Sequence, residues 1–286
     1  ACAALQVPTL LICGETQAQT GWRRRWSDFR MRSRMRYIDH IFASSARDAQ
    51  ALRKLGADAD RVEIIGPLEE GTPTLTCDER EWLAMTELVS GRPVWLAAMA
   101  QKTELPALDE AQRAASRMSH RLLLIVLPDD PGDGPVVADW FREQGWQTGL
   151  RSEGADPEAS LQVYVADTDD ELGLWYRVAP ITFMGTTLSQ TDGGGHDPYG
   201  PAALGSAIIH GPAVSRYHNE FGRLSDGGGT RKIKDGEELG IDVSEFLSPD
   251  RAAQQAHRAW EVTSQGAEAS DRVVDVTLRL IQDRAA

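Results

Sequence analysis

The segment GTTLSQTDGGGHDPYGPAALGSAIIHG, residues 185–211, decides the fold assignment of this 286-residue chain. It follows a short apolar run, Ile181–Met184, and it ends in a second run, Ala207–His210. A glycine-rich loop and the start of a helix at Pro201 lie between them. Strand, loop, helix and strand in this order are typical of a parallel α/β sheet, in which ligands bind at the carboxyl ends of the strands. The segment therefore predicts both a fold class and the place of a ligand site.

The loop itself has the composition of a backbone that approaches a ligand closely. Gly193, Gly194 and Gly195 have no side chain to block that approach, and amides at the N-terminus of the following helix can hold an anion. A surface loop without a ligand explains three glycines equally well. An isolated histidine such as His196 is more often a capping or packing residue than a catalyst.

Outward from the loop, the same alternation fills most of the chain. Further strands are expected at Val7–Cys13, His40–Ser44, Val62–Ile65, Val94–Ala98, Leu122–Leu127 and Gln162–Val165. Helices are expected at Ala46–Leu55, Asp78–Val89, Pro106–Arg117, Val136–Gln144 and Glu171–Val178, with Pro249–Ser264 and Ala267–Asp283 as two final helices. The order predicts two parallel α/β units that are joined near residues 70–90.

Composition excludes several classes of function. The net charge of −13 argues against general nucleic-acid binding, and no apolar run approaches the ~20 residues that span a bilayer. Three cysteines without a CxxC spacing, and histidines without an HExxH spacing, argue against a disulfide framework or a zinc site. A reducing cytoplasm is the compartment that fits this cysteine usage.

One segment, residues 22–36, departs from the acidic average. It is rich in arginine, contains Trp22, Trp26 and Phe29, and has Asp28 as its one acid. Such a segment can face phosphates or an anionic membrane surface, and it can equally be the solvated face of a helix. Both interpretations stay open.

Several short motifs around the loop occur together in one known family. They are VPTLL at 7–11, RPVWLAA at 92–98, RSEG at 151–154, DTDDELGLWY at 167–176, GGHDPYGPAALG at 194–205 and GP at 211–212. In this order, and over nearly the whole chain, the sequence resembles the bacterial transferases of 3-deoxy-D-manno-octulosonic acid (Kdo).

The resemblance implies the GT-B glycosyltransferase architecture, an α/β class with two Rossmann-like domains, of which the first is expected to be incomplete here. The expected parts are an acceptor-side domain at 1–77, a nucleotide-sugar domain at 78–268, and a C-terminal helix at 269–286 that crosses back to the first domain. The implied donor is CMP-Kdo, or CMP as its fragment, and the implied acceptor is the lipid A precursor of lipopolysaccharide. The implied location is the cytoplasm, at the cytoplasmic face of the inner membrane if the arginine-rich segment contacts it. Neither a cofactor nor a metal is expected.

The resemblance also assigns a candidate binding site. Its residues are Pro128, Asp129, Asp169, Asp170, Glu171, Gly194, Gly195, His196, Asp197, Pro198, Tyr199 and Gly200. No catalytic residue is assigned, because the family's catalytic glutamate belongs to a segment that would precede Ala1. Glu104 matches a glutamate of the family pattern.

The departures from the family pattern fall on this site. Asp129 replaces an arginine that would meet the donor phosphate, Asp197 replaces an asparagine, and Gly200 replaces a glutamate expected to bind ribose. Asp169 and Asp170 replace Met-Gly before the glutamate. Compensating positive charge is available from nearby basic residues, namely His210, Arg216, His218 and Arg223.

Three hypotheses follow from the resemblance and the departures. The chain is a Kdo transferase, a catalytically inactive GT-B binding module, or a transferase whose donor has changed. Fold similarity alone does not decide between them, because function depends on the residues of the site.

Overall fold

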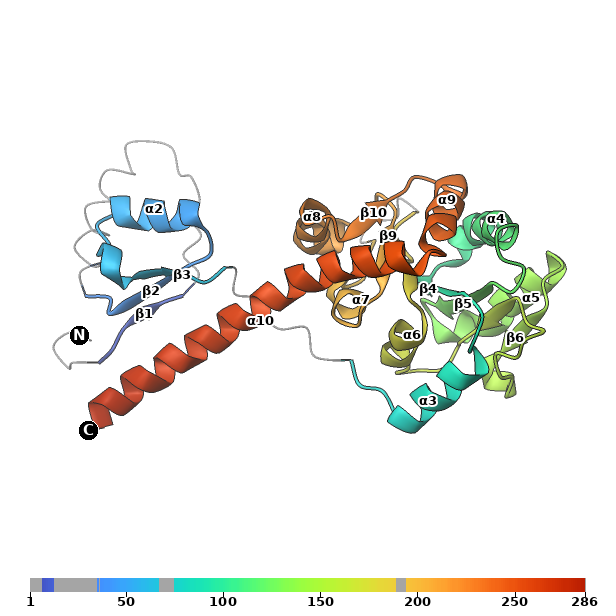
Figure 1. Ribbon diagram of the computed structural model, residues 1–286, viewed down its shortest axis with the longest axis horizontal. Helices are drawn as coiled ribbons and strands as arrows, with labels where there is room; N and C mark the ends of the chain where they lie inside the picture. The colour runs from blue at the N-terminus through green and yellow to red at the C-terminus, as the bar shows by residue number, and fades with distance from the viewer. Residues whose placement is uncertain (1–6, 13–34, 36, 67–74, 189–193, 286) are drawn as a thin grey trace. The chain divides into compact units, whose positions relative to one another are not determined.

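The computed structural model describes residues 7–12, 35, 37–66, 75–188 and 194–285 (Figure 1). The chain divides into two compact units, the first made of residues 1–71 and 264–286 and the second of residues 72–263. The arginine-rich segment at 22–36 lies outside the described residues except for Met35, as does Cys13 at the end of the first expected strand. Each unit is described by itself below.

Unit 1 contains a three-stranded parallel sheet in the order β1-β2-β3. The strands are β1 (Leu10–Leu11), β2 (His40–Ala43) and β3 (Val62–Ile64), with helix α2 (Ala46–Lys54) between the last two. The Ser45 side chain caps α2 by accepting a hydrogen bond from the Asp48 amide. The fully buried Phe42 packs with Val273 and Val276 of the C-terminal helix, which completes this small core.

Unit 2 is built on a seven-stranded, wholly parallel sheet in the order β10-β9-β8-β4-β5-β7-β6. In chain order the strands are β4 (Val94–Ala100), β5 (Leu123–Pro128), β6 (Thr148–Leu150), β7 (Val163–Val165), β8 (Ile181–Met184), β9 (Ala207–His210) and β10 (Thr230–Lys232). Its helices are α3 (Glu79–Leu88), α4 (Leu105–Ser116), α5 (Gly134–Glu143), α6 (Leu172–Val178), α7 (Tyr199–Ala203), α8 (His218–Asp226) and α9 (Gly236–Phe246), followed by the first part of α10 (Pro249–Ala285).

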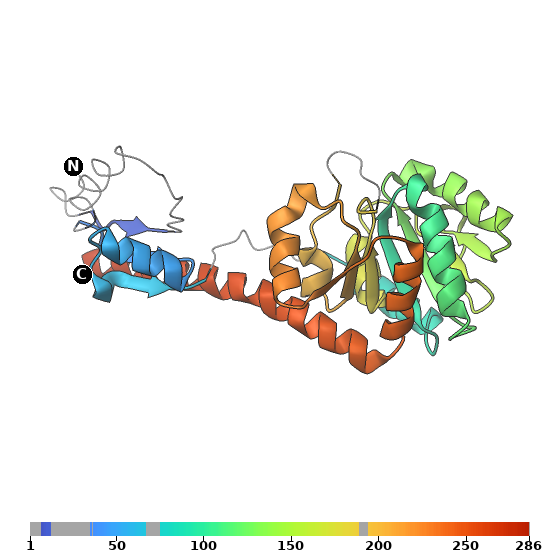
Figure 2. The same cartoon turned by 90° about the horizontal axis from the view of Figure 1, so that it is seen from above.

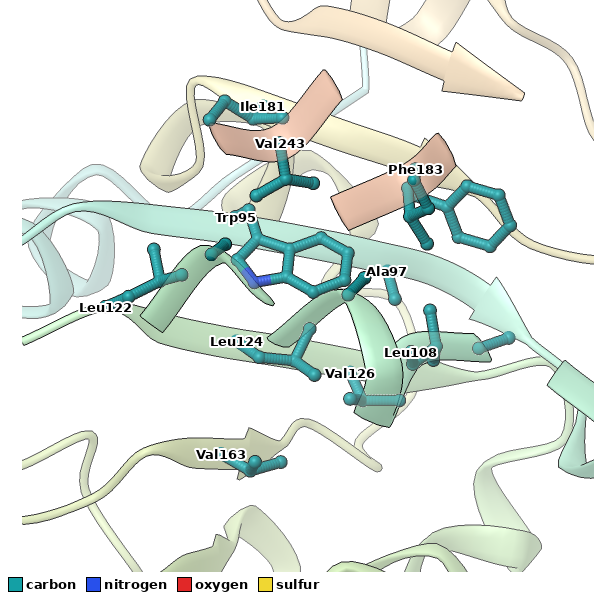
Figure 3. Packing of buried hydrophobic residues seen from close by; sticks show 14 of the residues in the cluster. Trp95, Ala97, Leu108, Leu122, Leu124, Val126, Val163, Ile181, Phe183 and Val243 are labelled. Atoms are coloured by element: carbon teal, nitrogen blue, oxygen red, sulfur yellow. The ribbon is translucent and has the colours of Figure 1, made fainter. Parts of the chain in front are cut away.

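Helices cover both faces of this sheet, as Figure 2 shows. Helices α4, α5 and α9 pack on one face around Trp95, whose indole lies among leucine, valine and phenylalanine side chains (Figure 3). The Trp95 Nε1–H donates a hydrogen bond to the buried Gln112 Oε1 at 2.7 Å, so the polar edge of the ring is satisfied. Helices α3 and α6 pack on the other face, where Trp175 and Tyr176 are buried core residues. Burial on both faces explains why the central strands β4, β5 and β8 are largely apolar runs.

Three features differ from the sequence-based expectations. The two expected C-terminal helices are one continuous helix, α10, which contributes residues to both units. A single interior glycine such as Gly266 costs a helix about 1 kcal/mol relative to alanine, which is too little to end a long helix. The sequence did not predict four elements, namely the strands β6 and β10 and the helices α8 and α9. Both strands are short and β10 is mostly exposed, so neither has an apolar signature.

The strand order places a switch point at β4. In the sheet, β5, β7 and β6 lie in this order on one side of β4, and β8, β9 and β10 lie on the other. In open parallel sheets, the crevice outside the carboxyl ends of the strands at such a point is where ligands bind. Within the described ranges, no helix combines the length and the apolar character needed to cross a bilayer.

Candidate functional site

The candidate site lies at the carboxyl ends of β4, β5 and β8. Ala100, the last residue of β4, is paired in register with Pro128, the last residue of β5. The Asp129 amide continues this pairing by donating to the Ala100 carbonyl at 3.0 Å, and the Gly185 amide donates to the Ala98 carbonyl at 2.7 Å. The loops that carry Asp129 and the glycine-rich segment therefore leave the sheet side by side.

The glycine-rich loop is anchored by the carboxylate of Glu104, which is 1% exposed. Its two oxygens accept hydrogen bonds from the amides of Thr186 at 2.8 Å, Thr187 at 3.1 Å and Leu188 at 3.0 Å, and from the Gln101 amide at 3.0 Å. Burial raises the pKa of Glu104, while these four amide donors oppose the rise. Glu104 is thus a structural clamp that positions the first residues of the loop.

The backbone at this edge is tightly packed. Thr186 adopts a φ of 60°, a left-handed conformation that a β-branched residue rarely takes, and Met99 adopts a φ of 56°. A Cβ on Gly185 would lie 2.3 Å from the Met99 carbonyl oxygen, and one on Gly194 would lie 2.5 Å from the Thr186 carbonyl oxygen. Backbone strain of this kind persists where the surrounding structure holds it, and it is concentrated at functional sites.

His196 and Asp129 are the two candidate residues that the fold brings into direct contact. The His196 Nε2 and the Asp129 Oδ1 lie 2.9 Å apart, and the two side chains are 28% and 36% exposed. The preceding Gly195 amide donates to the Thr186 hydroxyl oxygen at 3.0 Å, which fixes the chain just before the histidine. The loop therefore places the His196 imidazole at the end of β5.

The residues after His196 make mainly contacts within the protein. The Asp197 Oδ1 accepts the Tyr199 amide at 2.9 Å, so this N–H at the start of α7 is already satisfied. Pro198 precedes α7, which has only five residues. The Tyr199 hydroxyl accepts a hydrogen bond from Arg223 at 3.1 Å, and burial raises the pKa of Tyr199 to about 12. The expectation that the amides of this helix hold an anion has little support here.

Gly200, where the family has a glutamate, is buried. A Cβ on this residue would lie 3.1 Å from the Leu75 Cδ1 and 3.4 Å from the Tyr176 ring. The contact with Leu75 is tighter than an ordinary contact, whereas that with Tyr176 is ordinary, so Leu75 is the neighbour that a side chain at this position would have to displace.

The other acidic candidates follow β7 and form a separate group. Glu171 is paired with Arg151 at 2.5 Å, and Arg151 also pairs with Glu81 and donates to Thr168 at 3.1 Å. Burial alone would lower the pKa of Arg151, but its hydrogen bonds to the two glutamates and to a tyrosine hydroxyl outweigh burial and raise it. The charge of Glu171 is therefore neutralised inside the protein.

Asp169 and Asp170 remain exposed beside that pair. Asp170 adopts a φ of 62°, which aspartate tolerates better than most residues. The four compensating basic residues do not form one cluster. Arg223 contacts Tyr199, Arg216 lies over the Tyr217 ring at 5.6 Å, His218 begins α8, and His210 is buried at the end of β9.

The sequence singled out Glu104 only through its match to the family pattern, and it gave Arg151 no role of its own. Neither residue carries a local signal for its role. Each acts on segments that are distant along the chain. The hydrogen bonds that Glu104 accepts span up to 84 residues, and those that Arg151 donates span up to 70.

Comparisons with known proteins place these observations in context. Residues 1–69 match the sequence profile of the family described as 3-Deoxy-D-manno-octulosonic-acid transferase (kdotransferase). The 3-deoxy-D-manno-octulosonic acid transferase of Haemophilus influenzae is 28% identical over 187 residues, which cover 65% of this chain and 43% of the relative. The transferase of the same name from Rickettsia bellii is 21% identical over 281 residues, covering 98% of this chain and 65% of the relative.

Among solved structures, the C-terminal CMP-Kdo binding domain of WaaA from Acinetobacter baumannii superposes with a TM-score of 0.59 at 24% identity. The match covers 65% of this chain and 98% of that domain. The mixed α/β units with parallel sheets, together with this match, define the class as a GT-B glycosyltransferase fold. The resemblance to the Kdo transferase family, expected from the motifs, is confirmed by the profile match and the two relatives. The chain spans about half to two thirds of the length of these relatives.

Proposed function

We propose that this chain is a glycosyltransferase-like protein of the Kdo transferase type that binds CMP-Kdo, or its CMP part, on unit 2. One observation carries the proposal. The Glu104 clamp holds the glycine-rich loop at the carboxyl edge of the sheet and brings His196 to the end of β5. This edge is the ligand-binding edge of open α/β sheets, and the similar solved domain is described as CMP-Kdo binding.

The proposal assigns the twelve candidate residues to the carboxyl edge of the sheet. Residues 194–200 follow β8 and meet the end of β5, with Pro128 and Asp129, through the His196–Asp129 contact, while Asp169, Asp170 and Glu171 follow β7. The division into an acceptor-side part at 1–77, a donor part at 78–268 and a returning helix at 269–286 belongs to the same proposal. It is supported by the clustering of residues 264–286 with unit 1.

The acceptor in this proposal is the lipid A precursor, and the location is the cytoplasmic face of the inner membrane. Both rest on the family resemblance alone. They make the whole protein a component of lipopolysaccharide synthesis.

The chemistry of the site sets a condition on the proposal. A donor phosphate near Asp129 would meet a carboxylate where the family has an arginine. Two unit charges about 4 Å apart interact by up to about 4 kcal/mol at surface-like screening, and exposure lowers this value. A donor site that contains this negative charge is expected to bind CMP weakly. For the same reason, a donor with less negative charge is the second candidate.

Calorimetric titration of the full chain with CMP, beside the Asp129→Arg variant, tests the proposal. We expect weak binding by the original chain and at least tenfold tighter binding by the variant. An equal charge reversal on α5, Asp139→Arg, is the control, because Asp139 is exposed and its carboxylate contacts Arg142 on the same helix. Absence of CMP binding by both the original chain and Asp129→Arg would contradict the assignment of this edge as a CMP site.

A further inference from the structure

Unit 2 contains a polar cavity of about 390 Å³, and its lining includes none of the candidate donor residues. It lies between the start of β10, the end of α9 and the first turns of α10, and these elements adjoin in Figure 1. Because β10 begins there, the cavity is at the amino side of the sheet, whereas the donor site is at the carboxyl side. We call it the β10–α10 pocket.

The pocket is positively charged in a chain of net charge −13. Its walls carry Arg231, Arg251 and Arg258 and one acid, Glu245, so its net charge is +2. Three guanidinium groups, one from β10 and two from α10, line one cavity at an electrostatic cost, because like charges repel. An anion in the pocket would relieve that repulsion.

The three arginines differ in their ion pairs. The Glu245 Oε1 contacts Arg231 at 3.2 Å and Arg251 at 3.0 Å, so a single carboxylate oxygen serves two guanidinium groups. Arg258 has no carboxylate within 4.0 Å among the residues that the structure describes. Guanidinium donors in a fixed planar arrangement match the oxygens of a phosphate group.

One neutral residue of the wall, Gln255, is fixed in place. The buried Gln255 amide donates from Nε2 to the carbonyl oxygens of Ile208 at 2.9 Å and Gly229 at 3.3 Å, which fixes its orientation. Its Oε1 is buried without a hydrogen-bond partner among the described residues. Because this oxygen is closed to solvent, the pocket presents arginine donors to a ligand and not the Gln255 oxygen.

We infer that the β10–α10 pocket binds a small phosphate monoester. Arg258 is its main charged contact, and Arg231 and Arg251 are shared between the phosphate and Glu245. The cavity volume lies within the usual range for small-molecule sites and exceeds that of a lone phosphate ion. This inference is independent of the donor site proposed above.

Glycerol 3-phosphate is the probe, titrated into the full chain at constant ionic strength and followed by calorimetry. We expect one equivalent to bind, Arg258→Gln to weaken binding at least tenfold, and Glu245→Gln to tighten it severalfold by releasing two arginines. The matched controls are Arg142→Gln and Glu153→Gln. These residues pair with each other at 3.3 Å on the side of the sheet away from β10, and their loss should leave binding unchanged.

A second arm separates a dissolved ester from a lipid headgroup. Vesicles of phosphatidylcholine with phosphatidic acid are sedimented with the same variants. Binding of vesicles but not of glycerol 3-phosphate, with the same response to Arg258→Gln and Glu245→Gln, would identify the monoester as a headgroup. Binding to neither probe, or equal losses in Arg258→Gln and Arg142→Gln, would overturn the inference. CMP is itself a phosphate monoester, so Arg258→Gln should remove any CMP bound in this pocket. The gain in CMP affinity from Asp129→Arg should persist in the Arg258→Gln background, which distinguishes this site from the donor site.

Discussion

The imidazole of His196 and the carboxylate of Asp129 lie 2.9 Å apart at the carboxyl edge of the sheet, although 67 residues separate them in sequence. The contact links the glycine-rich loop to the end of β5. The family resemblance implies an arginine at the position of Asp129, whereas here the histidine faces an acid. In the proposed function, the negative charge of the Asp129 carboxylate lies near the donor phosphate.

Removing that charge without changing side-chain size should favour an anionic ligand. We expect Asp129→Asn to tighten CMP binding about tenfold, since one charge near a phosphate is worth on the order of 1–2 kcal/mol at a partly exposed site. Calorimetry at low and high salt checks this, because the difference should shrink as salt rises. Asp139→Asn is the control for a general change in net charge, and an identical gain in that variant would refute the role of Asp129.

The Glu104 clamp should be needed for stability. In Glu104→Gln, an amide with one acceptor oxygen and an NH2 group faces four backbone donors, so buried amides lose their partners. We expect the free energy of unfolding to fall by about 3 kcal/mol or more. Urea unfolding measures the loss, and amide exchange should show that Thr186–Leu188 lose protection first. Glu143→Gln, on the exposed end of α5, should change stability by no more than about 0.5 kcal/mol.

The two carboxylates paired with Arg151 should contribute unequally to the free energy of unfolding. The Glu171 side chain is 19% exposed, whereas that of Glu81 is 41% exposed. Neutralising the less exposed partner leaves a guanidinium with poorer compensation, so Glu171→Gln should destabilise by about 2 kcal/mol and Glu81→Gln by less than 1 kcal/mol. Thermal and urea unfolding of the two variants give the comparison. Equal losses would mean that solvent does not replace the Glu81 contact as argued.

Stability near neutral pH should depend on His210. Burial lowers the pKa of His210, and the nearby Lys232 adds to this effect, while a hydrogen bond to the Gly211 carbonyl opposes it. The unfolded chain therefore takes up the proton at a higher pH than the folded chain. The stability contributed by neutral His210 is complete above the ordinary histidine pKa of about 6.5, and it is lost as the pH falls toward the lowered folded value.

The His210→Met variant should remove this part of the pH dependence. Melting temperatures between pH 7.5 and pH 5.5 are the measurement, and the original chain should lose more than the variant. His257→Gln, at an exposed position on α10, should behave like the original chain. Parallel curves for the original chain and His210→Met would contradict the assignment.

Placing the glutamate of the family pattern at Gly200 as a single substitution should destabilise the protein. The Leu75 side chain would lie 3.1 Å from the new Cβ, so Gly200→Glu should lower the melting temperature by several degrees. Adding Leu75→Ala should recover part of that loss relative to the sum of the two single variants. A double-mutant cycle in urea checks the coupling, and strictly additive effects would show that Leu75 is not the obstacle.

Much of this fold follows from local sequence pattern. The continuous apolar runs of β4, β5 and β8 indicated a parallel sheet buried on both faces, and Gly193–Gly195 after such a run indicated a loop at its carboxyl end. The motifs around that loop were enough to establish the family resemblance. These signals are available from the sequence because strand burial and loop conformation depend on residues within a few positions of each other.

What only the tertiary structure decided are the partners across the sheet. The strand order brings β8 next to β4, so Glu104 meets amides more than 80 residues away, and Asp129 meets His196. It also assigns Glu171 to Arg151, which removes one of the expected negative charges from the site. Local pattern cannot specify these contacts, because the same set of strands can be ordered in several ways, and only the packing of the whole sheet selects one.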